Sequence, residues 1–150
     1  MGTVTIDTRP YGPLTVDERQ ILTFVNGLFG FEHLTRYALL DSHQPPFYWL
    51  QSLEDPQVAF VVIDPRVFRP DYDPAPLPSD LEALGLERQE DLLIFAIVTI
   101  PENQREMTAN LQGPLLVNRK TRRAAQVIST DDRWHVKHRI LEELAALRKR

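Results

Sequence analysis

The residues best suited to metal chemistry are three aspartates in a proline-rich segment, Asp64, Asp71 and Asp73. Asp71 and Asp73 flank a single residue, and two carboxylates at that spacing hold Mg²⁺ or Ca²⁺ in some enzymes. Five prolines fall within residues 65–78, however, and no nucleotide-binding motif accompanies the aspartates, which favours a solvated loop. A metal-dependent hydrolase or transferase is therefore kept as an alternative function.

Two histidines three residues apart, His135 and His138, could present their imidazoles to Zn²⁺. The remaining histidines, His33 and His43, fall in distant turns and supply no third ligand, so we expect surface histidines here. The chain has no cysteine, and it lacks the G-x-S-x-G, glycine-rich phosphate-loop and H-E-x-x-H motifs. We therefore expect no catalytic residue, no cofactor and no metal site, and a protein that is not an enzyme.

A cluster of polar side chains follows the most apolar segment of the chain. Residues 92–100 carry no charge and are rich in β-branched side chains, which predicts a strand buried on both faces. Pro101 cannot donate to a sheet and should end that strand. Polar groups held at the end of a rigid strand suit recognition of a partner. The predicted partner-binding residues are Pro101, Glu102, Asn103, Thr108, Asn110, Gln112 and Asn118.

The asparagines in this cluster have a second possible role. Asn103 and Asn110 can bond neighbouring backbone groups and so hold a turn in place. Both roles, partner contact and turn capping, remain open from the sequence.

The elements that position these groups are predicted to be short strands separated by turn residues. We expect strands at residues 4–6, 20–25, 37–40, 47–53, 58–63, 92–100, 115–117 and 124–128, with a single helical turn at 31–34. Adjacent strand residues point to opposite faces, so Phe47, Tyr48 and Trp49 cannot all face one core. Without βαβ alternation, the chain is predicted to be all-β and mainly antiparallel, a small barrel-like or sandwich domain with one short helix and a C-terminal helix.

Two helices are predicted to accompany the strands. Ser79 with Glu82 forms a capping box, and the short helix that it begins should end near Gly85. The C-terminal amphipathic helix is expected at about residues 133–150. Its predicted apolar face comprises Val136, Ile140, Leu141, Leu144 and Leu147.

Length and composition predict one soluble domain over residues 1–150, with 43% apolar and 25% charged residues. The sequence has no apolar run of membrane-spanning length and no signal-peptide pattern at its N-terminus, so we expect a cytoplasmic protein without membrane contact, either a monomer or a weak dimer.

The charge is distributed unevenly. Residues 1–104 carry 6 Lys/Arg and 16 Asp/Glu, whereas residues 105–150 carry 11 and 5. If the two parts stay apart in space, the acidic part would attract a basic partner; if they fold together, they neutralise each other. A nucleic-acid-binding barrel is a second alternative, although the acidic pI of about 5.5 disfavours it. Its basic residues would be Arg119, Lys120, Arg122, Arg123, Arg148, Lys149 and Arg150.

Four blocks of the sequence resemble the FliW family of flagellar assembly factors. They are FVNGLFGFE from Phe24, FYWLQSL from Phe47, AFVVIDP from Ala59 with Tyr72, and the block from Thr99 to Asn118 that leads into AQVI at Ala125. The most specific is the last, IPEN followed by TANLQGPLLVN. Together the blocks span almost the whole chain.

The resemblance implies a β-rich, barrel-like protein of flagellated bacteria that acts without catalysis. Members of the family bind flagellin before its export, and bind the translational repressor CsrA when flagellin is depleted, which relieves repression of flagellin synthesis. Three features depart from the usual family pattern: Phe29 and Gln104 stand where proline is common, and the predicted C-terminal helix is longer and more basic.

Overall fold

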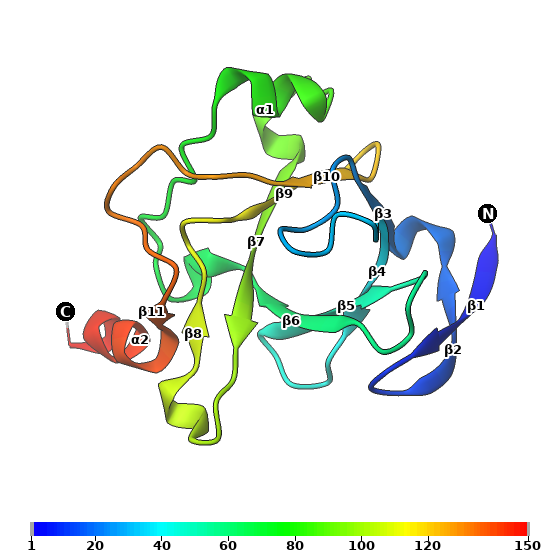
Figure 1. Cartoon of the computed structure of the whole chain (residues 1–150). Coiled ribbons are helices and arrows are strands. Elements are labelled where there is room, and N and C mark those ends of the chain that lie inside the picture. Colours follow the sequence, from blue (N-terminus) through cyan, green and yellow to red (C-terminus); the bar gives the residue numbers. More distant parts are fainter. Residues whose placement is uncertain (1, 150) are drawn as a thin grey trace.

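Seven strands close into a ring in the computed structural model, which describes residues 2–149 (Figure 1). Six of the seven neighbouring pairs are antiparallel, and β3 with β10 is the one parallel pair. The fold is therefore all-β, mainly antiparallel and barrel-like, as the sequence predicted. In order around the ring the strands are β7 (Leu92–Thr99), β6 (Ala59–Ile63), β5 (Phe47–Ser52), β4 (Arg36–Asp41), β3 (Ile21–Phe24), β10 (Arg123–Gln126) and β9 (Leu115–Asn118).

The barrel interior is filled by alternate side chains of every strand, because successive strand residues point to opposite faces. Leu22, Tyr37, Leu50, Val62 and Phe95 belong to this interior cluster. The other face of β7 also packs, through Ile94, Ala96 and Val98, against the outer cluster. The prediction that β7 is buried on both faces is therefore confirmed.

One end of the barrel is plugged by the loop of residues 25–35. Leu28, Phe31 and Leu34 point from this loop into the interior cluster. The loop turns at Gly27, where φ is +66° and an added Cβ would lie 2.7 Å from the Glu32 Cα. Only glycine fits such a close approach without strain. Residues 31–34 form turns rather than the predicted helical turn, because the pairing of Leu28 with Phe31 takes the backbone out of a helical path.

A hairpin of β1 (Thr3–Thr8) and β2 (Gly12–Asp17) covers one outer side of the barrel. Ile6 and Val16 pack there on Ala38 and Leu40, with Trp49 beside them. Phe47 packs into the other outer cluster, whereas Tyr48 lies edge-on to Phe95 and is partly exposed. The three adjacent aromatic residues thus face different surroundings, as predicted. The predicted strands do not include β2.

The second outer cluster lies beneath residues 64–77, α1 (Pro78–Ala83), β8 (Thr108–Ala109), β11 (His138–Arg139) and α2 (Ile140–Arg148). Short 3-10 turns, Glu18–Gln20, Pro65–Val67, Gln89–Asp91 and Gln104–Glu106, complete the chain. The N-cap position of α1 is occupied by Leu77 rather than by Ser79. Pro78 begins the first turn, and the Asp80 side chain accepts from the Leu77 N–H at 3.0 Å. Among the described residues, no helix is long and apolar enough to cross a membrane.

The C-terminal helix is shorter than the predicted 133–150. It begins at Ile140 because β11 pairs with β8 and because the carbonyl of His135 accepts from the N–H groups of Leu111 and Gln112. These long-range hydrogen bonds hold residues 131–139 in a non-helical path. Ile140, Leu144 and Leu147 still lie on the less exposed face of the helix, but Val136 lies outside it and is exposed. Arg150, which the helix and basic-tail predictions include, lies outside the described residues.

Candidate functional site

The loop after β7 carries the first of the predicted partner-binding residues. The strand ends at Thr99, just before Pro101, and Pro101, Glu102 and Asn103 are all exposed. The Asn103 side chain accepts from the Arg105 N–H at 3.1 Å and caps the 3-10 turn Gln104–Glu106. Asn103 therefore has the turn-capping role, on a loop that is open to a partner.

A groove of about 300 Å³ runs beside this loop, between it and the tip of the β1–β2 hairpin. Tyr11 and Ile100 are its exposed apolar residues. The Tyr11 hydroxyl donates to the Asp41 carbonyl at 2.9 Å, which fixes one wall of the groove. Its other lining residues are Pro10, Ser42, Gln44, Phe47, Trp49, Val61, Gln104 and Met107.

Asn110 and Gln112 lie on a separate turn that is held firmly from both sides. The side-chain oxygen of Asn110 accepts from the backbone N–H groups of Gln112 at 3.1 Å and Gly113 at 2.9 Å. The Gln112 carbonyl accepts from the Ser129 N–H at 2.8 Å, and the Gln112 N–H donates to His135. Such a turn presents its side chains from a fixed backbone, which suits recognition.

Three exposed apolar side chains surround this turn: Phe29 at 53% exposure, Ile128 at 62% and Val136 at 53%. Together with Asn110, Gln112 and Gly113 they line a hollow of about 250 Å³. We name this set the docking patch. Exposed apolar side chains that converge on a few polar groups are typical of protein-binding surfaces.

Gln126 fixes the relative position of the two loops that form the docking patch. Its side-chain oxygen accepts from the Phe29 N–H at 2.9 Å, and its side-chain nitrogen donates to the Gly113 carbonyl at 3.0 Å. A Cβ on Gly113 would lie 3.1 Å from both the Gln126 and the Asn110 amide nitrogens. The glycine thus leaves room for the bridging amide.

The remaining two predicted residues do not reach the docking patch. Thr108 lies in β8, where it pairs with Thr99 and Arg139. Asn118 is 3% exposed, donates to the Leu84 carbonyl at 2.9 Å and accepts from the Lys120 and Thr121 N–H groups. Its polar atoms are engaged within the chain, so the geometry assigns Asn118 to holding the β9–β10 turn. The structure therefore separates the predicted residues instead of joining them in one site.

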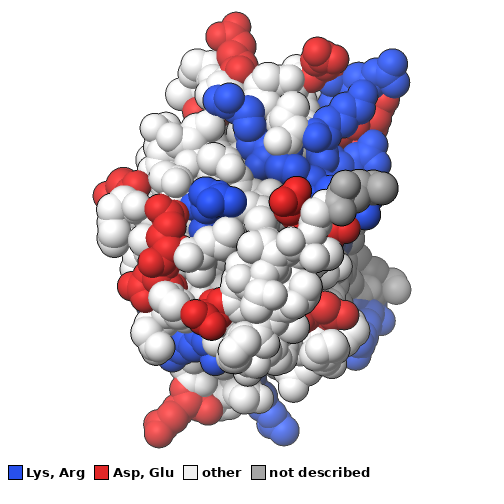
Figure 2. Space-filling model, turned by 90° about the vertical axis from the view of Figure 1, so that its right-hand side faces the viewer, with Lys and Arg blue, Asp and Glu red and all other residues white. Residues whose placement is uncertain are grey.

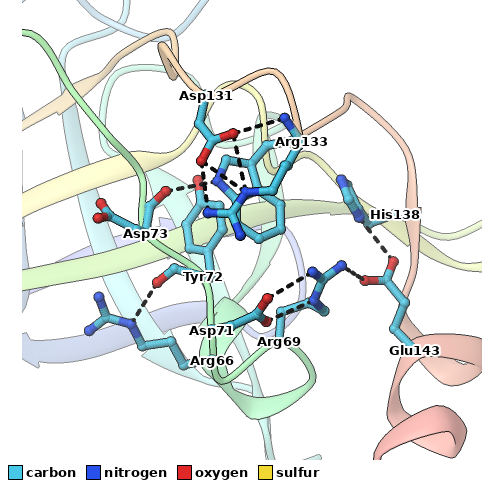
Figure 3. Close-up of polar contacts among 10 residues, drawn as sticks. Arg66, Arg69, Asp71, Tyr72, Asp73, Asp131, Arg133, His138 and Glu143 are labelled. Carbon is cyan, nitrogen blue, oxygen red and sulfur yellow. Dashed lines mark hydrogen bonds and ion pairs between the residues drawn. The ribbon is translucent and has the colours of Figure 1, made fainter.

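The aspartates of the metal-site alternative each have a protein partner. Asp71 accepts two hydrogen bonds from Arg69, at 3.0 Å each (Figure 3). Asp64 and Asp73 accept from the backbone N–H groups of Arg66 and Ala75. The Arg69 guanidinium holds the pKa of Asp71 below its usual range. Within residues 2–149, no group of three histidine, cysteine or acidic side chains is placed to hold a metal ion.

His138 is only 7% exposed, so the prediction of a surface histidine is wrong for this residue. It is buried because residues 131–139 fold over the barrel instead of forming an exposed helix. Its Nε2 accepts from the His135 N–H at 2.9 Å, and its Nδ1 lies 3.0 Å from the Glu143 carboxylate. The neutral ring therefore carries its proton on Nδ1, donated to Glu143 (Figure 3). Burial lowers the pKa of His138, and nearby Glu143 offsets part of this effect.

The basic residues of the nucleic-acid alternative do not form one surface. The β9–β10 turn and the end of α2 lie on different sides of the barrel (Figure 1). Arg119 and Lys120 pair with Asp91 at 2.9 Å and 3.8 Å, so part of their charge is balanced by the acidic part of the sequence.

The apolar residues of the docking patch were missed by sequence reasoning. The predicted strand at 124–128 includes Ile128, the predicted helix face includes Val136, and Phe29 stands out in the sequence as a departure from the proline that is common in the family. The one available signal was Phe29, a large apolar residue between two turn glycines.

Comparisons with known proteins agree with the fold. The family model described as FliW protein matches residues 5–140. The flagellar assembly factor FliW of Treponema denticola is 47% identical over 141 residues, 94% of this chain and 96% of the relative. The factor of the same name from Treponema pallidum is 48% identical over 146 residues, 95% of each chain. A crystal structure of the flagellar assembly factor FliW superposes with a TM-score of 0.85 at 32% identity, covering 91% of this chain and 96% of that chain.

Proposed function

The chain belongs to the FliW family of flagellar assembly factors, and from that premise we propose that it is a non-enzymatic regulator that binds flagellin and a CsrA-type translational repressor. Flagellin binding is the chaperone-like activity. Binding of the repressor when flagellin is scarce releases flagellin synthesis from repression, so that the two partners are exchanged. This activity belongs in the cytoplasm, where flagellin is made.

The observation that carries the proposal is the docking patch. Three large apolar side chains stay exposed on loops that several hydrogen bonds hold in place, which is costly unless a partner covers them. Asn110 and Gln112 lie among them and supply polar groups that can fix the orientation of a bound chain. The loop of Pro101, Glu102 and Asn103, with its adjoining groove, offers a second contact for a partner, separate from the docking patch.

The acidic balance of residues 1–104 supports a basic second partner such as a CsrA-type repressor. Charges of opposite sign speed the encounter of two proteins, and salt screens them. We therefore expect complex formation with the repressor to slow and weaken as salt is raised. Binding that depends mainly on the docking patch should respond less to salt, since apolar burial is not screened.

The test is calorimetric titration of the full chain with purified flagellin and with the repressor, at low and at high salt. We expect Phe29→Ser and Ile128→Ser each to weaken at least one complex about tenfold, since each removes an exposed apolar anchor. Leu77→Ser is the matched control, because Leu77 is 51% exposed but lies at the start of α1 and does not line the docking patch. Absence of binding to both proteins at low salt would refute the proposal.

A further inference from the structure

The barrel has an open end, where the interior side chains of Leu39 and Leu93 are partly exposed. The plug of residues 25–35 closes one end, whereas a cavity of about 320 Å³ opens at the other. We call this cavity the barrel mouth. Its apolar lining consists of interior side chains of four different strands: Leu22, Leu39, Leu93, Phe95 and Val117. Asp17, Arg19, Gln20 and Arg122 form its polar rim. Because apolar surface left in water is unfavourable, such a mouth is suited to an apolar group.

Arg122 differs from the other charged residues of the polar rim and from its neighbours Arg119 and Lys120. Arg19 donates two hydrogen bonds to Asp17, at 3.2 Å and 3.0 Å, and Arg119 and Lys120 pair with Asp91. Within residues 2–149, Arg122 has no carboxylate within ion-pairing distance. It is partly buried, and its own N–H donates to the Asn118 carbonyl at 2.8 Å. An arginine half-withdrawn from water at the edge of an apolar cavity is well placed to pair with an incoming carboxylate.

The backbone at Arg122 is also unusual, with φ at +65°. Asn118 bonds the N–H groups of Lys120 and Thr121 and so builds the turn that holds Arg122 in this conformation. Non-glycine residues in this region are uncommon and carry some strain. The turn therefore positions a cationic side chain at the mouth, at a backbone position that asparagine or glycine would occupy with less strain.

The wider surface around this turn is basic. The β9–β10 turn lies at the upper right of Figure 1, the side that faces the viewer in Figure 2, and lysine and arginine side chains gather in the upper right of that view. Residues 119–123, which span this turn, carry four lysine or arginine residues in five positions. An acidic ligand would be attracted to this end of the barrel, although the whole chain is acidic.

We propose that the barrel mouth binds an acidic segment of a protein partner, which inserts an apolar side chain between Leu39, Leu93 and Phe95 and pairs a neighbouring carboxylate with Arg122. The cavity lies at the small end of the range of ligand sites, roughly 300–1,000 Å³, which fits one or two side chains better than a whole cofactor. The open basic surroundings leave room for the rest of the segment and for further acidic residues. This inference concerns a second surface and stands apart from the partners proposed above.

The experiment titrates the ¹⁵N- and methyl-labelled full chain with three blocked tetrapeptides. The sequence Asp-Leu-Phe-Glu carries both required features, Lys-Leu-Phe-Lys reverses the charge, and Asp-Ser-Ser-Glu removes the apolar side chains. We expect only the first to shift the methyl signals of Leu22, Leu39, Leu93 and Val117, with an affinity that falls as salt rises. Equal binding of the first two peptides would overturn the role of charge, and shifts confined to other residues would overturn the site.

Variants of two adjacent arginines separate a specific ion pair from general charge. Arg122→Gln should weaken the acidic peptide about tenfold, since it removes a charge-assisted hydrogen bond, and Arg122→Lys should restore part of the affinity. Arg123→Gln removes the same charge from an exposed strand position that pairs with Thr23, and should change affinity less than about twofold.

Equal effects of the Arg122→Gln and Arg123→Gln substitutions would contradict the proposed contact. Octanoate serves as a second probe, because it has an apolar chain and one carboxylate but no peptide. If octanoate shifts the mouth methyl signals and the acidic peptide does not, the site takes small aliphatic acids and the proposal of a protein segment is wrong. Concentration-dependent shifts without any probe would instead assign the mouth to a second copy of the chain.

Discussion

Replacement of Trp134 should test whether one side chain holds the second outer layer on the barrel. Trp134 is 1% exposed and lies edge-on to Tyr72, with 4.8 Å between ring centroids. The guanidinium groups of Arg69 and Arg133 both lie 4.8 Å from its ring centroid. The indole N–H donates to the Asp73 carbonyl at 2.8 Å. Trp134 thus joins the proline-rich segment to the segment that precedes β11.

The loss expected for Trp134→Ala is set mainly by the cavity that it creates. Removal of a buried aromatic side chain costs about 3–5 kcal/mol in the free energy of unfolding. The lost hydrogen bond adds about 1 kcal/mol. The two cation–π contacts, from arginines that keep part of their surface in water, add about 1 kcal/mol each at most. Trp134→Phe retains most of the apolar contact and should lose roughly 1–3 kcal/mol, through the hydrogen bond and a smaller cavity.

The assay is urea unfolding followed by far-ultraviolet circular dichroism and by the fluorescence of Trp49, the other tryptophan, which packs beneath the β1–β2 hairpin. For a chain of this size the alanine variant should also melt roughly 8–30 °C lower, since the terms together give about 4–8 kcal/mol. Val136→Ala is the control, since Val136 is exposed two residues away and should cost less than about 0.5 kcal/mol. A loss below about 1 kcal/mol for Trp134→Ala would refute the reasoning, because the two segments would then be held by other contacts.

Three further predictions follow from the geometry. Burial lowers the pKa of His138 below the ordinary value of 6.5, so the unfolded chain binds this proton first as pH falls. The free energy of unfolding should therefore decline below about pH 6.5 and level off below the folded pKa. Urea midpoints of the wild type and of His138→Gln across this pH range will check it. Gly27→Ala should lower the free energy of unfolding by more than about 2 kcal/mol, since the new Cβ would meet backbone at 2.7 Å. Gly12 has the same sign of φ but open space around it, so Gly12→Ala should cost only about 1 kcal/mol. Equal shifts of the melting temperature would remove steric overlap as the cause. The double substitution Asn103→Ala and Asn110→Ala should weaken at least one partner complex while the domain stays folded. The lost turn caps should lower the free energy of unfolding by about 1–2 kcal/mol. A lower melting temperature with unchanged affinity would show that these residues only hold their turns.

The strands of the barrel could be predicted because their signals are local. Segments such as residues 58–63 and 92–100 combine branched side chains with flanking turn residues, and tertiary contacts reinforce these preferences. The strand β2 was not predicted because its first residues are Gly12 and Pro13, which normally mark a turn. The closure of the ring, with a parallel contact between β3 and β10, has no local signal at all.

Residues 131–139 could not be predicted because competing interactions are long-range. The sequence there has helical periodicity, yet two backbone hydrogen bonds, from Leu111 and Gln112 to the His135 carbonyl, and the burial of Trp134 favour a non-helical path. This difference accounts for two errors together: the early start of the predicted helix and the exposure expected for His138. The same non-helical path places Val136 beside Asn110, so the docking patch could not be assembled from the sequence.

The two ends of the barrel differ in chemistry, and this bears on how partners could be exchanged. The plug loop places Phe29 on the docking patch at one end, where the polar groups are neutral amides. From Gly113 at the patch the chain enters β9, which ends at Asn118, and the Asn118 side chain builds the turn that holds Arg122 at the barrel mouth. A partner bound at one end leaves the other uncovered, so exchange through simple overlap requires both partners to use the same end. If binding studies show one partner sensitive to Phe29→Ser and the other to Arg122→Gln, exchange must instead work through the strand and turn that connect the two ends.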